Sequence, residues 1–125
     1  MHATQLETYR NMQKATLNGR ELEAEILSKA ALKLKFCQNN WEAPNRDELL
    51  DEALKFNQKI WTLFQSELAK PESPLPKKLR ENLLNLSMFI DKRIFEIMSF
   101  PSPEKLNAII DINLNIAAGL RNSPA

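Results

Sequence analysis

The segment RDELLDEALKFNQKIWTLFQSELA, residues 46–69, has the clearest helical periodicity in this chain of 125 residues. Its apolar side chains recur at alternating steps of four and three, the spacing that places them on one face of an α-helix. Further apolar residues beside this seam make the face too broad for exposure to water, so the pattern predicts a helix packed against others. The seam consists of Leu50, Leu54, Asn57, Trp61, Phe64 and Leu68, and it is widened by Ala53, Phe56, Ile60 and Leu63.

Prolines divide the rest of the chain into further helical segments. We expect helices at about residues 19–38, 76–99 and 103–120, a weakly periodic segment at 1–17 and a disordered tail at 121–125. Pro76 and Pro103 suit a first helical turn, where the missing N–H costs nothing. Asn18, Asn45 and Ser102 suit N-caps, and Gly119 suits a helix end. The expected buried residues include Leu22, Ile26, Leu27, Ala30, Leu34 and Cys37 in the first of these helices.

No segment shows the period-two alternation of a β-strand. The chain length matches one domain that buries a sizeable core without a metal or disulfide. The sequence therefore predicts a single all-α domain over residues 1–125, a small bundle of four to five helices with short, proline-marked loops.

The composition argues against several classes of function. Lysine and arginine number 17 against 16 acidic residues, which gives no electrostatic reason for direct nucleic-acid binding or membrane-surface binding. The N-terminus lacks an apolar signal sequence, and the single Cys37 suits a reducing compartment, so we expect a cytoplasmic protein. With one histidine and two glycines, we expect no enzymatic activity, no catalytic residues, no metal site and no cofactor.

Two asparagines fall on apolar helix faces and require an explanation. An unpaired buried amide costs about 1–3 kcal/mol, so Asn57 and Asn113 each need a hydrogen-bond partner. One interpretation is an interhelical bond, from Asn57 to backbone or to Asn113, that fixes helix register; the other is recognition of a partner's backbone in a groove. Trp61 on the seam is expected in the core. Trp41, in a polar loop, either caps the bundle or anchors an interface.

Three segments, EALKFNQKIW at 52–61, LPKKLRENLLNLSMFI at 75–90 and IIDINLNIAAGLR at 109–121, carry short motifs. In this order they resemble the flagellar biosynthesis regulator FlaF family of alphaproteobacteria. The segment EALKFNQKIW is similar to the family's Ala-Leu, asparagine and tryptophan pattern. LPKKLRENLLNLSMFI resembles its Leu-Pro and Leu-Arg pattern, and IIDINLNIAAGLR its Ile-Asn and Gly-Leu pattern. Tyr9 and the arginine-glutamate start at 20–23 also fit, whereas the loop around Trp41 looks lengthened. The residues that carry the resemblance are Ala53, Leu54, Asn57, Trp61, Leu75, Pro76, Leu79, Arg80, Leu86, Ile112, Asn113, Gly119 and Leu120.

The resemblance implies a cytoplasmic factor that promotes flagellin synthesis and export. Its partners would be the terminal helices of flagellin, with FlbT as a further partner. An apolar groove in a helical bundle could hold an amphipathic flagellin helix, and displacement of segment 4–17 could open such a groove. The candidate partner-binding residues are Trp41, Asn57, Trp61, Phe64, Leu79, Arg80 and Asn113.

Two other interpretations remain open at the level of sequence. One is a post-transcriptional regulator of flagellin expression that acts through FlbT or on flagellin messenger RNA. The other is a purely structural oligomerisation module. Steeply salt-dependent RNA binding would favour the first, and self-association would favour the second.

Overall fold

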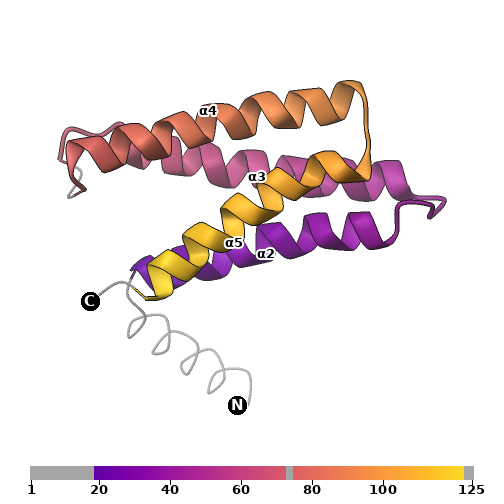
Figure 1. Ribbon diagram of the computed structural model, residues 1–125, viewed down its shortest axis with the longest axis horizontal. Helices are drawn as coiled ribbons and strands as arrows, with labels where there is room; N and C mark the ends of the chain where they lie inside the picture. The colour runs from indigo at the N-terminus through magenta and orange to yellow at the C-terminus, as the bar shows by residue number, and fades with distance from the viewer. Residues whose placement is uncertain (1–18, 73–74, 123–125) are drawn as a thin grey trace, which may run out of the picture.

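The computed structural model describes residues 19–72 and 75–122, which form four α-helices and one short 3-10 helix (Figure 1). No β-strand occurs in this part of the chain, and the prediction of an all-α bundle is confirmed. The expected segment 1–17 and the cap residue Asn18 lie outside the described residues. The helices are α2 (Gly19–Asn39), α3 (Arg46–Leu68), α4 (Lys77–Ser99), η1 (Pro103–Leu106) and α5 (Asn107–Arg121).

The first three helices lie side by side, and the last one crosses them. In Figure 1, α2, α3 and α4 run back and forth, and α5 passes diagonally from the end of α4 to the start of α2. The main packing contacts join α2 with α5, α2 with α3, and α3 with α4. Each of α2 and α3 thus has two neighbouring helices, and a further part of each helix surface faces solvent.

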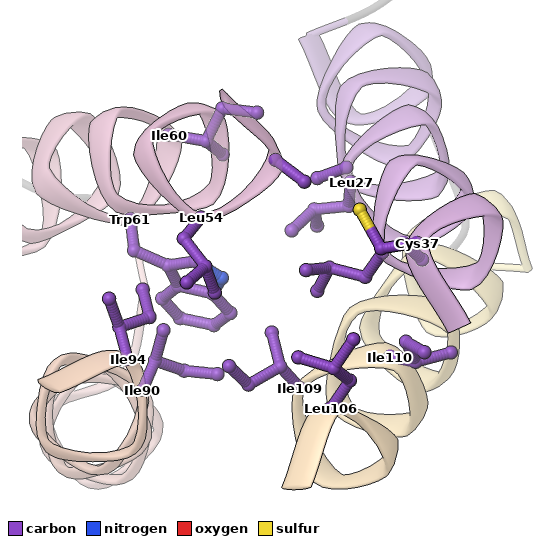
Figure 2. Close-up of a cluster of buried hydrophobic side chains, with 14 of the residues drawn as sticks. Leu27, Cys37, Leu54, Ile60, Trp61, Ile90, Ile94, Leu106, Ile109 and Ile110 are labelled. Atoms are coloured by element: carbon purple, nitrogen blue, oxygen red, sulfur yellow. The ribbon is translucent and has the colours of Figure 1, made fainter. Parts of the chain in front are cut away.

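The core lies where all four helices approach one another. Figure 2 shows Trp61 of α3 pointing into the middle of a cluster to which α2, α4 and α5 also contribute. The seam of the sequence segment 46–69 supplies the α3 side of this core, as its period of 3.6 predicts. The largest fully buried apolar side chains are Trp61, Leu27, Leu34, Leu54, Ile90, Ile94, Ile97, Leu106 and Ile109.

The predicted side-chain caps at Asn45 and Ser102 are wrong. Asn45 and Ser102 stand at the N-cap positions of α3 and η1, but neither side chain makes a cap hydrogen bond. The amide of Leu49 donates to the carbonyl of Asn45 at 3.1 Å, and that of Lys105 to the carbonyl of Ser102 at 3.3 Å. A 3-10 turn closes its hydrogen bond after three residues, so the hydroxyl of Ser102 is not required there.

The C-terminal helix extends further than the sequence analysis predicts. Gly119 does not end it, since α5 continues to Arg121 and the amide of Asn122 donates to the carbonyl of Ala118 at 3.1 Å. No glycine among the described residues has a positive φ, so Gly119 does not adopt the left-handed conformation of a helix stop. Arg121 is therefore helical, and residues 123–125 of the expected tail lie outside the described residues.

Two residues expected in the core are exposed. Ile26 of α2 is 42 % exposed and Leu63 of α3 is 58 % exposed. Both lie at the edge of the apolar face of their helix, as the helical positions of the buried residues around them show. The apolar face of each of these two helices is thus wider than the part that packs into the core, and the remaining apolar side chains contact solvent.

Two leucines of α2 provide a matched test of this core assignment. Leu27 is 0 % exposed and Leu32 is 63 % exposed. We expect Leu27→Ala to lower the free energy of unfolding by about 2–5 kcal/mol, because it leaves a cavity in the core. Leu32→Ala is expected to change it by less than about 0.5 kcal/mol. Urea denaturation followed by circular dichroism measures both values, and equal losses in the two variants would contradict the core assignment.

Candidate partner-binding surfaces

The buried asparagines belong to one hydrogen-bond network at the centre of the bundle. The Nδ2 of Asn113 donates to the Oδ1 of Asn57 at 2.6 Å, and the indole Nε1 of Trp61 donates to the Oδ1 of Asn113 at 2.9 Å. The Nδ2 of Asn57 donates to the carbonyls of Ala30 at 3.1 Å and Ala53 at 2.9 Å. The network therefore connects α2, α3 and α5, and the interhelical hydrogen bond considered from the sequence is confirmed.

These polar groups are paired within the chain. Asn57 and Asn113 are both 0 % exposed, and Trp61 is 1 % exposed. Both NH₂ protons of Asn57 have acceptors, and each amide oxygen accepts a bond, so the desolvation cost of burying these groups is offset. In this structure the network does not reach the surface. A role of Asn57, Trp61 and Asn113 in partner recognition stays a prediction.

Trp41 of the α2–α3 loop and Arg46, the first residue of α3, form a cation–π pair. The Arg46 guanidinium lies 4.4 Å from the centroid of the Trp41 ring, and Arg46 also donates through Nε to a carboxylate oxygen of Asp47 at 2.7 Å. One face of the half-buried indole packs against the core cluster. Trp41 thus covers one end of the bundle, as one of the two interpretations from the sequence expects, and part of the side chain stays exposed. A role of Trp41 in an interface stays a prediction.

The remaining predicted site residues lie in other places. Phe64 is half-buried and meets Trp61 edge to face, with ring centroids 5.8 Å apart. Arg80 donates through Nη1 to the carbonyl of Lys70 at 3.2 Å and so joins the first turn of α4 to the start of the α3–α4 loop, just after α3 ends. Leu79 beside it is exposed. The α3–α4 loop lies at the opposite end of the bundle from Trp41, so the seven predicted residues do not form one site (Figure 1).

A groove between α2 and α3 is the site that the sequence analysis missed. Its volume is about 390 Å³. Leu32 and Phe36 on its α2 side are 63 % and 54 % exposed, and Leu49 on its α3 side packs partly against the core. The signal in the sequence is that Leu32 and Phe36 are large apolar residues outside the core seam of α2. The groove is lined by Lys29, Leu32, Lys33, Phe36, Cys37, Leu49, Glu52 and Ala53.

Two lysines place positive charge beside this groove. The ammonium groups of Lys29 and Lys33 lie 5.7 Å and 5.0 Å from the centroid of the Phe56 ring, within cation–π distance. Lys33 also pairs with Glu52 at 3.4 Å. Lys29 forms no ion pair with any other residue that the structure describes. The groove thus combines an apolar floor with one ammonium that lacks a carboxylate partner in this part of the chain.

Cys37 forms part of the groove wall but has little exposed surface. Burial raises the pKa of the Cys37 thiol, the nearby Glu52 carboxylate raises it further, and the Lys33 ammonium opposes this shift. The residue as a whole is 2 % exposed. Because the thiolate is the nucleophilic form, these surroundings describe an unreactive structural cysteine.

A second apolar surface lies on α4. Met88, Phe95 and Met98 are 68 %, 71 % and 45 % exposed. Steps of seven and three place them on one side of the helix, and we call this set the α4 stripe. It lies on a different helix from the groove, and it provides a natural control surface for binding experiments.

The described residues contain neither a candidate metal cluster nor a candidate membrane-spanning helix. No group of three or more histidine, cysteine or acidic side chains in residues 19–72 and 75–122 is arranged to hold a metal ion. None of the helices in these ranges has the length and apolar character needed to cross a membrane.

Comparison with protein families gives a match over almost the whole chain. The family model described as flagellar protein FlaF matches residues 5–120. The chain belongs to the FlaF family. The suspected resemblance is thereby confirmed, and it relates the chain to the flagellum. Searches of curated proteins and of solved structures found no match to this FlaF-family chain.

Removing Asn113 tests the network in this FlaF-family protein. Asn113→Ala deprives the Trp61 indole N–H and the Asn57 Oδ1 of their partners, so we expect a loss of about 2–5 kcal/mol in the free energy of unfolding. Asn115→Ala is the control, because Asn115 is exposed on the same helix. Urea denaturation measures both, and similar small effects would contradict a structural role for the network.

The chemistry of Cys37 gives a separate test. We expect iodoacetamide to alkylate Cys37 at least about tenfold more slowly in the folded protein than in urea, because a buried thiol with a raised pKa supplies little thiolate. The pKa of the Cys37 thiol is higher in the folded than in the unfolded protein. The neutral thiol therefore contributes to the free energy of unfolding at pH values below the ordinary thiol pKa, and this contribution is lost as pH rises through the folded pKa. Cys37→Ala should remove that alkaline loss. Equal alkylation rates in the folded and unfolded states would disprove the assignment.

Proposed function

We propose that this FlaF-family chain is a non-enzymatic, flagellin-binding secretion chaperone and regulator in the cytoplasm. It promotes flagellin synthesis and export by holding an amphipathic terminal helix of flagellin against an apolar surface. The observation that carries the proposal is the groove between α2 and α3, an apolar cleft on a protein whose family is flagellar.

The exposed apolar side chains support this role. Large apolar residues normally gather in the core, and contiguous exposed ones mark sites of interaction with proteins or membranes. The exposed Leu32 and Phe36 of α2 line a cleft, together with Leu49 of α3. A protein partner with an apolar face would remove these side chains from water, which is favourable.

The chemistry of an amphipathic helix matches such a surface. A helix with apolar residues at i, i+3, i+4 and i+7 is unstable as an isolated segment and prone to aggregate through its exposed face. Shallow contact with a groove buries that face without forming a permanent core. The bound helix is thus kept soluble and can be released, which is what a chaperone for export needs.

The α4 stripe supports an additional role through FlbT. A surface formed by Met88 and Phe95 on a separate helix allows a second protein to bind while the groove is occupied. Methionine side chains adapt to differently shaped partners.

Regulation of flagellin expression through FlbT, or on flagellin messenger RNA, is the alternative function. The near-neutral charge of the chain favours contact with FlbT over direct contact with RNA.

Direct binding measurements test the proposed function. Peptides from the N-terminal and C-terminal helices of flagellin are titrated into the purified protein and followed by isothermal titration calorimetry. We expect one of them to bind with a Kd in the micromolar range, about −8 kcal/mol at 1 μM. A flagellin leader RNA in the same assay addresses the alternative. No association of either peptide at 100 μM protein, together with salt-dependent RNA binding, would replace the chaperone proposal with the RNA one.

A further inference from the structure

We infer that the α2–α3 groove takes an amphipathic helix that presents a carboxylate to Lys29, and that it disfavours a helix with a cation at that place. The inference rests on the proposed function, because the helix in question is the one that the chaperone holds. It adds the surface on which that helix lies and the charge that the surface selects.

The shape of the groove matches a short helix. On α3, Leu49, Phe56 and Leu63 follow one another at steps of seven residues and therefore lie on one line along the helix. That line is about 21 Å long, the length of roughly 14 helical residues. On α2, Leu32 and Phe36 are one turn apart and line the groove together with Leu49. Lys29 and Lys33 lie over Phe56, further along α3. A helix of about four turns laid along the α3 line would therefore meet apolar side chains in the groove and the two ammonium groups beside it.

Apolar side chains on both walls are available for contact. Leu32, Phe36 and Leu63 are 63 %, 54 % and 58 % exposed. Their apolar atoms contact solvent in the unbound protein, so a partner that covers them removes apolar area from water. The widening of the apolar face beyond the core, which leaves Ile26 and Leu63 exposed, extends the same surface.

The charges beside the groove specify the partner further. Lys29 and Lys33 both lie over the ring of Phe56, and this brings two ammonium groups to one place on the groove edge. Glu52 offsets Lys33, whereas Lys29 has no ion pair among residues 19–72 and 75–122. A carboxylate on the partner would pair with Lys29 at the edge of an apolar contact, where neighbouring side chains exclude water and strengthen the attraction. A lysine there would meet like charge.

Two probe peptides test the charge preference without relying on flagellin. Both are 14-residue amphipathic helices with leucines at i, i+4, i+7 and i+11; one has glutamates beside the leucines, and its twin has lysines. Fluorescence anisotropy with each labelled peptide should show at least about tenfold tighter binding of the glutamate peptide. Lys29→Glu should abolish that preference, and added salt should weaken it. Equal binding of the twins to the wild-type protein, or a preference that persists in Lys29→Glu, would overturn the inference.

Two double variants locate the surface. Leu32→Ala with Phe36→Ala should weaken binding of the glutamate peptide at least about tenfold, whereas Met88→Ala with Phe95→Ala on the α4 stripe should leave it unchanged. All four residues are exposed, so both variants should retain the wild-type circular dichroism spectrum and Tm. Binding that survives the first double variant, or is lost in the second, would overturn the assignment to the groove.

The flagellin peptides in the same panel separate this inference from the proposed function. A flagellin peptide that binds the wild type and the groove variant equally well leaves the chaperone function in place and overturns the groove as its site. A flagellin peptide that binds neither protein counts against the chaperone function, and the glutamate and lysine probes then still decide whether the groove selects an acidic helix.

Discussion

The hydrogen bond between Asn57 and Asn113 is the interaction on which the arrangement of the helices depends. It connects α3 to α5 at 2.6 Å, and the second bond of the Asn57 amide, to the carbonyl of Ala30, includes α2 in the same network. Apolar packing alone tolerates a shift of one helix along another, whereas a buried amide pair has partners in only one register. The positions of the α2 and α3 side chains on both walls of the groove are therefore tied to a polar contact at the centre of the core.

The same network relates the interior to the surface of this FlaF-family protein. Because α2 and α3 are held in one register, Lys29 and Lys33 come to lie over Phe56, and Leu32 comes to lie across from Leu49. The groove is then a preformed feature of a fixed helix pair. A binding surface that exists before its partner arrives saves the free energy of ordering the chain, which allows a shallow contact to be both specific and reversible.

The sequence predicts the fold far better than it predicts the site. Helical periodicity and the prolines locate the four α-helices of the described residues, because the apolar seam of α3 and the prolines between helices are local features. The expected helix at 103–120 is α-helical only from Asn107, since Pro103–Leu106 form the 3-10 helix η1. The pairing of Asn57 with Asn113 can be proposed, since a buried amide must find a partner. The groove cannot, because the sequence places Leu32 and Phe36 outside the core seam of α2 but does not show which part of α3 lies beside them. The exposure of Ile26 and Leu63 depends likewise on where α4 and α5 pack, which no single helix encodes.

Hydrogen–deuterium exchange with and without the bound flagellin peptide tests the central claim most directly, namely that a fixed helix pair presents a preformed groove. The account predicts slower exchange at amides of residues 29–37 and 49–56 on binding, with the amides of α5 around Asn113 equally protected in both states. Faster exchange around Asn113 in the complex, or protection confined to α4, would show that binding opens the core or uses another surface, and would contradict the account.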